Sequence, residues 1–195
     1  MVRVIAGTCR SRKLKTLDSE ATKPTLDRVK EAMFSIISDA IPGAVVFDVF
    51  AGNGSLGIEA LSRGAERCVF CDISGDCIKI IKENVAALEL VSRSEVIKGD
   101  FKEAVNSLIK KNTVADVLLL DPPYRKGLIE KALTAKGIEK ICHGAGENVF
   151  PPEKTIALCE HAKEEILPEQ LGDFRKIKTK SYGTVGLTLY EYCGE

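Results

Sequence analysis

The tetrapeptide Asp121-Pro122-Pro123-Tyr124, which follows the apolar run at 115–120, has the residue types and spacing for chemistry on an amine. In an open parallel sheet, the carboxyl ends of the central strands form the active-site edge. Two prolines remove two N–H donors, so this turn presents hydrogen-bond acceptors. The Asp121 carboxylate and the Pro122 carbonyl could accept both N–H groups of an aromatic amine, and Asp121 could take the released proton. Because Tyr124 offers a ring for stacking, the pattern predicts chemistry on an exocyclic amine of a nucleobase.

A glycine-rich loop earlier in the chain fits two different cofactors. Its glycines satisfy G-x-G-x-x-G from Gly52 to Gly57, and Asp72 follows 20 residues after Gly52, as in dinucleotide sites. Asp48 distinguishes the two, because a carboxylate just before the glycines would oppose the pyrophosphate of NAD. S-adenosylmethionine has no phosphate and carries a cationic sulfonium and ammonium, which Asp48 favours. We therefore expect S-adenosylmethionine, with Asp72 on the ribose hydroxyls under either interpretation.

Further contacts with the methyl donor are expected at the ends of the same strands. Asp100 could accept a hydrogen bond from the adenine amine, and Phe101 could line the adenine ring. Gly52 and Gly54 allow the backbone to approach the ligand closely, because glycine has no Cβ atom. The expected donor site comprises Asp48, Phe50, Ala51, Gly52, Asn53, Gly54, Asp72, Ile73, Asp100 and Phe101.

Apolar strands and amphipathic helices alternate along the chain, which predicts an α/β fold with a doubly wound, mostly parallel sheet. We expect strands at 45–50, 67–73, 95–100, 115–121 and 155–161, then an antiparallel pair at 175–181 and 185–192. Helices are expected at 27–40, 55–63, 76–90, 102–110 and 128–136, and a Gly- and Pro-rich loop at 142–152. The chain is expected to form one domain, with an N-terminal basic arm at 1–26 and a catalytic core at 27–195.

Length and composition exclude several classes of protein. The 195 residues are 45% hydrophobic, enough for one full core, and 29% charged residues argue against a disordered chain or a membrane protein. The start is too short and too quickly basic for a signal peptide. Seven scattered cysteines indicate no disulfide framework, and the single CxxC of Cys68 and Cys71 lacks further metal ligands. We therefore expect a cytoplasmic protein with no metal, in which these two cysteines fill space on a strand.

Basic residues cluster in two places although the formal net charge is zero. Residues 1–30 contain eight Lys and Arg against three acids, and the four basic residues within 175–180 follow one another without an acid. Such clusters can neutralise phosphates. Solvated faces of edge elements explain either cluster equally well.

Taken together, the motifs resemble the RsmD family, bacterial enzymes that methylate the N2 amine of one guanine in 16S ribosomal RNA. The resemblance is carried by residues 3–7, 10–14, 23–31, 48–57, 59–65, 121–124 and 182–183. It implies a seven-stranded methyltransferase fold with an N-terminal β-hairpin, and a guanine held by residues 121–124. It also implies an RNA-facing group, Arg10, Arg12, Lys13, Thr25 and Arg28. The sequence departs from the family at Asn53, where serine is common, and in the loop at 142–152.

Several alternatives remain open from the sequence. DNA adenine-N6 methyltransferases share the tetrapeptide, although 195 residues leave little room for the target-recognition domain that they usually need. An NAD-dependent oxidoreductase and a non-catalytic RNA-binding module are further alternatives. The expected partner is 16S ribosomal RNA or the 30S subunit, bound by a monomer with no membrane contact.

Overall fold

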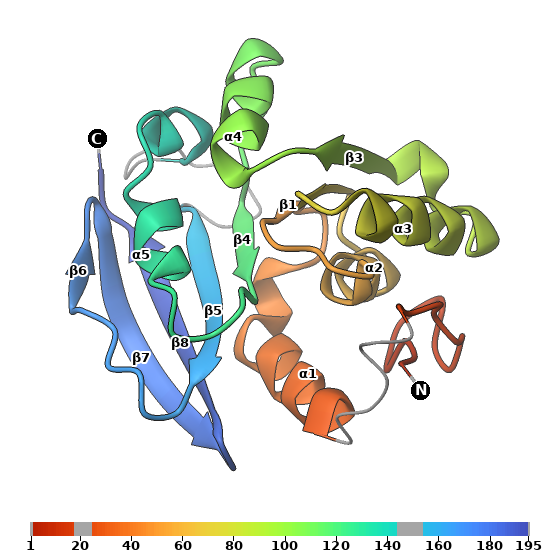
Figure 1. Ribbon diagram of the computed structural model, residues 1–195, viewed down its shortest axis with the longest axis horizontal. Helices are drawn as coiled ribbons and strands as arrows, with labels where there is room; N and C mark the ends of the chain where they lie inside the picture. Colours follow the sequence, from red (N-terminus) through yellow and green to blue (C-terminus); the bar gives the residue numbers. More distant parts are fainter. Residues whose placement is uncertain (1, 18–24, 144–153, 195) are drawn as a thin grey trace.

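The centre of the molecule is one eight-stranded sheet, with the strand order β3-β2-β1-β4-β5-β8-β7-β6 (Figure 1). The computed structural model describes residues 2–17, 25–143 and 154–194. Strands β1 to β5 run parallel, whereas β8, β7 and β6 each run antiparallel to the strand before them in this order. The strands are β1 Val45–Asp48, β2 Arg67–Asp72, β3 Ser94–Lys98, β4 Val117–Leu120, β5 Ile156–Ala162, β6 Gln170–Leu171, β7 Phe174–Tyr182 and β8 Val185–Tyr192.

Helices cover both faces of this sheet. They are α1 Thr25–Ile36, α2 Ser55–Ser62, α3 Gly75–Ala87, α4 Phe101–Lys110 and α5 Leu128–Leu133, with 3-10 helices at Ser38–Ala40, Val91–Arg93 and Ile138–Ile141. Successive strand residues point to opposite faces, so Val46 of β1 packs with α1, α2 and α3, and Phe47 packs with α4 and α5. A parallel sheet covered in this way is buried on both faces, which explains why all four residues of β4 are apolar.

The mostly parallel α/β sheet predicted from the sequence is confirmed, with eight strands instead of seven. The additional strand, β6, has two residues and pairs with the first two residues of β7. Two residues are too few for a periodic hydrophobic pattern, so the sequence could not reveal this strand.

Three predicted helices end three or four residues early in the structure, and one of these, expected at 76–90, ends at Ala87. The helix expected at 27–40 ends at Ile36, and its last turn tightens into the 3-10 helix Ser38–Ala40. The helix expected at 128–136 ends at Leu133, and the left-handed Gly137, with φ of 92°, begins a separate 3-10 helix. Of the loop expected at 142–152, residues 144–152 lie outside the described residues.

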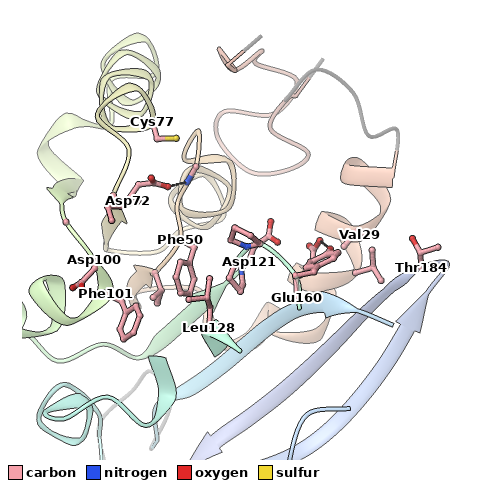
Figure 2. Close-up of a pocket in the computed structure, with 18 residues that line it drawn as sticks. Val29, Phe50, Asp72, Cys77, Asp100, Phe101, Asp121, Leu128, Glu160 and Thr184 are labelled. Atoms are coloured by element: carbon pink, nitrogen blue, oxygen red, sulfur yellow. Dashed lines mark hydrogen bonds between the residues drawn. The ribbon is translucent and has the colours of Figure 1, made fainter. Parts of the chain in front are cut away.

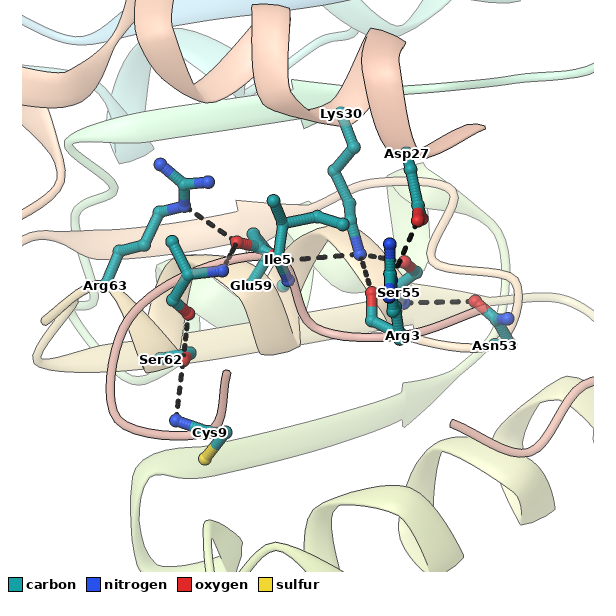
Figure 3. Close-up of polar contacts among 12 residues, drawn as sticks. Arg3, Ile5, Cys9, Asp27, Lys30, Asn53, Ser55, Glu59, Ser62 and Arg63 are labelled. Carbon is teal, nitrogen blue, oxygen red and sulfur yellow. Dashed lines mark hydrogen bonds and ion pairs between the residues drawn. The ribbon is translucent and has the colours of Figure 1, made fainter. Parts of the chain in front are cut away.

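The N-terminal arm forms a short antiparallel hairpin that packs against α2. Arg3 and Lys13 form an antiparallel bridge, and Val4 N–H and Leu14 N–H donate across it to the carbonyls of Arg12 and Val2, at 2.9 and 3.0 Å, which confirms the expected β-hairpin. At the tip side of this pairing, the N–H groups of Ile5 and Ala6 donate to the Glu59 carboxylate, at 2.8 and 2.9 Å (Figure 3). The arm is therefore held by a side chain of α2 as much as by its own pairing.

Glu59 is fully buried and joins the arm to two helices (Figure 3). Its carboxylate pairs with Lys30 of α1 at 3.2 Å and with Arg63 at 2.8 Å. Lys30 also donates to the carbonyl of Arg3 and to the hydroxyl of Ser55. Burial lowers the pKa of Lys30, and the charge of Glu59 opposes that shift. This buried network fixes α1 and the arm relative to the sheet.

Within the described ranges, no helix is long and apolar enough to cross a membrane. The CxxC of Cys68 and Cys71 lies buried on β2 as free thiols, which confirms that these residues fill space on a strand. Burial raises the pKa of Cys71 to about 12 and that of Cys68 well above its ordinary value. Both thiols are therefore held in their neutral, unreactive form.

Candidate active site

Strand β1 pairs with β2 on one side and with β4 on the other. The strands that follow β1 in the chain are thus added first on one side of it and then on the other, which makes β1 the topological switch point. Crevices at such switch points, outside the carboxyl ends of the strands, are the usual ligand sites of open α/β sheets. A cavity of about 580 Å³ lies there (Figure 2). It is lined by Val29, Val49, Phe50, Gly52, Asp72, Ile73, Cys77, Gly99, Asp100, Phe101, Asp121, Pro122, Pro123, Tyr124, Leu128, Glu160, Thr184 and Val185.

The cavity has two ends with different side chains. One end lies at the carboxyl ends of β1, β2 and β3 and contains Phe50, Asp72, Asp100 and Phe101; we call it the glycine-loop end. The tetrapeptide end follows β4 and β5 and contains Tyr124 and Glu160, with Val29, Thr184 and Val185 beside them. Figure 2 shows Asp121 between these two groups. One cavity therefore joins the two motifs that the sequence placed about 70 residues apart.

Asp72 anchors the glycine-loop end through backbone hydrogen bonds. Its Oδ2 accepts from the N–H of Gly52 and its Oδ1 from the N–H of Ser74, both at 2.8 Å. These bonds fix the orientation of a carboxylate that lines the cavity. Each carboxylate oxygen has a second lone pair, so ligand hydroxyls could still be bound.

Asp48 does not line the cavity, contrary to the expectation of a direct donor contact. It is the last residue of β1, and its side chain points into the α2 face of the sheet, where Oδ2 accepts a hydrogen bond from Gly57 N–H at 2.9 Å. Its buried Oδ1 has no hydrogen-bond partner among the described residues. Burial raises the pKa of Asp48 to about 7, the Gly57 bond opposes this shift, and the charge of Asp72 adds to it.

Three other expected donor contacts, Ala51, Asn53 and Gly54, also lie outside the cavity lining. They shape the loop instead. Gly54 has a φ of 80° and donates its N–H to the Ala51 carbonyl at 2.7 Å, which closes a tight turn. The Asn53 side chain accepts from the N–H of Ser55 at 3.1 Å. Their contribution in this structure is to the conformation of the loop that carries Gly52.

Apolar and aromatic side chains line the rest of the glycine-loop end. Phe50 and Phe101 meet edge to face, with ring centroids 6.0 Å apart, and Ile73 is 75% exposed. Such surfaces suit one flat, apolar ring system. Asp100 also lines the cavity, but its Oδ1 caps α4 by accepting from the N–H of Glu103 at 2.9 Å. Asp100, expected at the end of a strand, is therefore the N-cap residue of α4.

All four residues of the tetrapeptide line the cavity, as predicted. Their position follows from the pairing of β4 with β1, which continues past β1 through a hydrogen bond from Val49 N–H to the Leu119 carbonyl at 3.0 Å. The Tyr124 hydroxyl donates to Oε1 of Glu160. Burial, this hydrogen bond and the charge of Glu160 raise the pKa of Tyr124 well above its usual range, so its hydroxyl remains a donor.

Glu160 is the main cavity residue that sequence reasoning missed. It lies near the carboxyl end of β5, next to the strand that ends before Asp121. The same rule that selected Asp121, a polar residue at the carboxyl end of a central parallel strand, could have selected it. Val29, by contrast, comes from α1, and only the tertiary structure brings that helix to the cavity.

Of the residues expected to face RNA, the four whose side chains the structure describes all lie outside the cavity lining. Arg10, Lys13 and Arg28 are exposed. Arg12 is also exposed, but its guanidinium donates to the carbonyl of Ala87 at the end of α3, at 2.9 Å, so part of its role is structural. The side chain of Thr25 lies outside what the structure describes.

Comparison with known proteins shows which family has this arrangement. The family model described as "Conserved hypothetical protein 95" matches residues 2–191. Over 97% of its length, the chain is 35% identical to Ribosomal RNA small subunit methyltransferase D of Haemophilus influenzae, of which 93% is covered. The chain belongs to the RsmD family. The Escherichia coli protein of the same name is 30% identical, over 97% of this chain and 89% of that relative.

Solved structures of methyltransferases share the fold of this chain. The Escherichia coli protein yhhF superposes with a TM-score of 0.78 at 29% identity, over 100% of this chain and 99% of that one. An RNA methyltransferase of Salinibacter ruber, in complex with S-adenosyl-L-homocysteine, shares the fold with a TM-score of 0.63 at 18% identity, over 89% and 95% of the two chains. RsmD proteins are S-adenosylmethionine-dependent methyltransferases, so the chain is an enzyme of that class. The NAD-dependent oxidoreductase alternative is therefore wrong.

Proposed function

We propose that this RsmD-family enzyme methylates the exocyclic N2 amine of a guanine in 16S ribosomal RNA. The observation that carries the proposal is the position of Asp121, which lies in one cavity between the glycine-loop end and the tetrapeptide end. Asp121 can accept a hydrogen bond from the amine of a base bound at the tetrapeptide end. From the same position it faces a methyl donor bound at the glycine-loop end. The names of the Haemophilus influenzae and Escherichia coli relatives support ribosomal RNA of the small subunit as the substrate.

The glycine-loop end fits S-adenosylmethionine, which when bound supplies a methyl group activated by a sulfonium. Asp72 would accept hydrogen bonds from the ribose hydroxyls. Phe50, Phe101 and Ile73 would enclose the adenine, and Asp100 would accept from its amine. Asp48 would act from beneath the loop, where a bound cation would favour the ionised form of a carboxyl that burial otherwise keeps protonated up to a pH of about 7.

At the other end, the chain's own acceptors would activate the guanine amine. The lone pair of an exocyclic amine is delocalised into the ring, which makes the nitrogen a poor nucleophile. When its N–H groups donate to the Asp121 carboxylate and the Pro122 carbonyl, electron density returns to nitrogen. Asp121 would then accept the proton that the methylated amine releases. Tyr124 would stack on the base and offset part of the free energy needed to extrude it from folded RNA.

Labelled methyl transfer tests this function directly. The purified enzyme is incubated with labelled S-adenosylmethionine and either 16S ribosomal RNA or 30S particles, and the nucleosides are separated by mass spectrometry. We expect the label in N2-methylguanosine. Asp121→Asn should lower the rate by about a hundredfold or more, because general-base and charge contributions are lost together. Lys110→Gln, an exposed change on α4, serves as the matched control. The absence of label from guanosine in both RNA substrates would exclude the proposal.

A further inference from the structure

Glu160 is the second carboxylate at the tetrapeptide end, and strand register explains its position. Leu120, the last residue of β4, lies opposite Cys159 of β5, so Asp121 directly after β4 comes level with Glu160 of β5. Neighbouring strands are about 4.8 Å apart, and residues in register point to the same face. Both side chains line the cavity, although Glu160 is only 8% exposed. A base whose amine contacts Asp121 therefore presents an adjacent edge atom to Glu160.

The adjacent atom differs among the bases that carry an exocyclic amine. In guanine the N2 amine lies beside N1–H, which is a second donor. In adenine the N6 amine lies beside N1, and in cytosine the N4 amine lies beside N3, and both of these ring nitrogens are acceptors. Two neighbouring carboxylates match two neighbouring donors. The same pair would set a carboxylate oxygen against the lone pair of adenine or cytosine, and a buried acceptor without a donor is costly.

We propose that Glu160 is a specificity-determining residue that selects guanine by accepting a hydrogen bond from its N1–H while Asp121 holds the N2 amine. The inference rests on the proposed function and deepens it. Sites built to bond a specific donor discriminate strongly against analogues that lack it, since their own polar groups are then left unpaired. Glu160 is buried, so water has little access to its carboxylate. When a base lacks the N1–H donor, water therefore does not replace it, and the base is discriminated against.

Tyr124 orients the Glu160 carboxylate. Its hydroxyl donates to Oε1, and a carboxylate has about four lone-pair sites, so acceptor capacity remains for the base. Tyr124 would thus stack on the base with its ring and position Glu160 with its hydroxyl. The alternative role for Glu160 is that of an anchor for Tyr124 alone. The two roles differ in one measurable respect, because an anchor would not distinguish bases by the hydrogen on N1.

The test compares guanosine with 2-aminopurine at the target position of the RNA, once mass spectrometry has located it. The analogue keeps the 2-amine but lacks the O6 carbonyl and has an N1 lone pair instead of N1–H, so the change that a Glu160 variant makes in the preference isolates the N1 contact. Wild type should favour guanosine in kcat/KM by about tenfold or more, the effect of one hydrogen bond to a charged group. Glu160→Gln should reduce this preference by about tenfold, because the amide can also donate to an N1 lone pair. Tyr124→Phe, which removes only the hydroxyl, should slow both substrates while largely keeping the preference.

Each outcome distinguishes this inference from the proposed function. A wild-type enzyme that methylates guanosine and 2-aminopurine equally well would overturn the role of Glu160, whether or not the variant folds. An unchanged preference in Glu160→Gln, with S-adenosylhomocysteine binding intact as proof of folding, would overturn it as well. If wild type transferred no methyl to guanosine in any small-subunit substrate, the proposed function itself would fail.

Discussion

The backbone N–H of Gly52 donates to the carboxylate of Asp72 at 2.8 Å, so the glycine loop after β1 is bonded to the residue that ends β2. The bond crosses between two neighbouring parallel strands at the glycine-loop end of the cavity. It holds the Asp72 carboxylate in one orientation before any ligand binds. Such preorganisation lowers the entropic cost of binding.

Replacement of Asp72 should therefore weaken donor binding. We expect Asp72→Ala to reduce the affinity for S-adenosylhomocysteine by about tenfold to a hundredfold, through the loss of hydrogen bonds between a carboxylate and the ribose. Isothermal titration calorimetry measures this directly. Asp76→Ala, at an exposed acid in the first turn of α3, is the matched control and should bind as wild type does. Equal affinities in all three proteins would show that Asp72 has only a structural role.

Asp48 should make the stability of the fold depend on pH. Burial raises its pKa from 3.8 to about 7, so between these values the folded protein keeps a proton that the unfolded chain releases. The stabilisation from this group is complete below pH 3.8 and is lost as the pH rises through about 7. Asp48→Asn cannot ionise and should lack this loss, which for wild type is on the order of a few kcal/mol.

Urea denaturation of both proteins between about pH 4.5 and about pH 8 checks this expectation. The free energy of unfolding of Asp48→Asn should rise relative to wild type as the pH increases through this range. Asp39→Asn, at an exposed position, controls for the removal of a negative charge. Parallel pH profiles for wild type and Asp48→Asn would contradict the raised pKa.

Glu59 should contribute strongly to stability because it balances a buried cation. Glu59→Ala would leave Lys30, whose side chain is 5% exposed, without its carboxylate partner. It would also remove the acceptor of two arm N–H groups. We expect a loss of about 3–5 kcal/mol in the free energy of unfolding, measured with urea. Glu83→Ala breaks the exposed pair with Lys15 and should leave stability nearly unchanged. Similar losses in both variants would argue against the buried network.

The arm residues Arg10 and Lys13 should contribute to RNA affinity by neutralising phosphates. Their replacement by Gln should weaken binding and lower the slope of log K against log salt by about one for each phosphate that is no longer neutralised. Fluorescence anisotropy with a small-subunit RNA fragment over a salt series measures both quantities. Lys140→Gln, at an exposed position in the 3-10 helix after α5, is the control. An unchanged slope in the arm variants would place the RNA elsewhere on the surface.

Local sequence signals predicted most of the fold and both motifs of the candidate site. The order of strands and helices follows from hydrophobic periodicity, which depends only on near neighbours in the chain. The glycine loop and the tetrapeptide are contiguous segments, so their types and spacing are visible without a structure. The carboxyl-end rule then predicted that Asp72 and Asp121 would meet at one edge of the sheet, and both line the cavity.

The tertiary structure decided which of these side chains face the cavity and which residues join them from elsewhere. Side chains along β1 point alternately to the two faces of the sheet, and Asp48 points to the face that α2 covers. It does so although it lies just before the glycine loop in sequence. Glu160 reaches Tyr124 only through the register of β5 on β4. Glu59 takes up the N–H groups of an arm more than 50 residues away. Such contacts depend on side-chain direction and on the packing of distant segments, which periodicity and spacing do not encode.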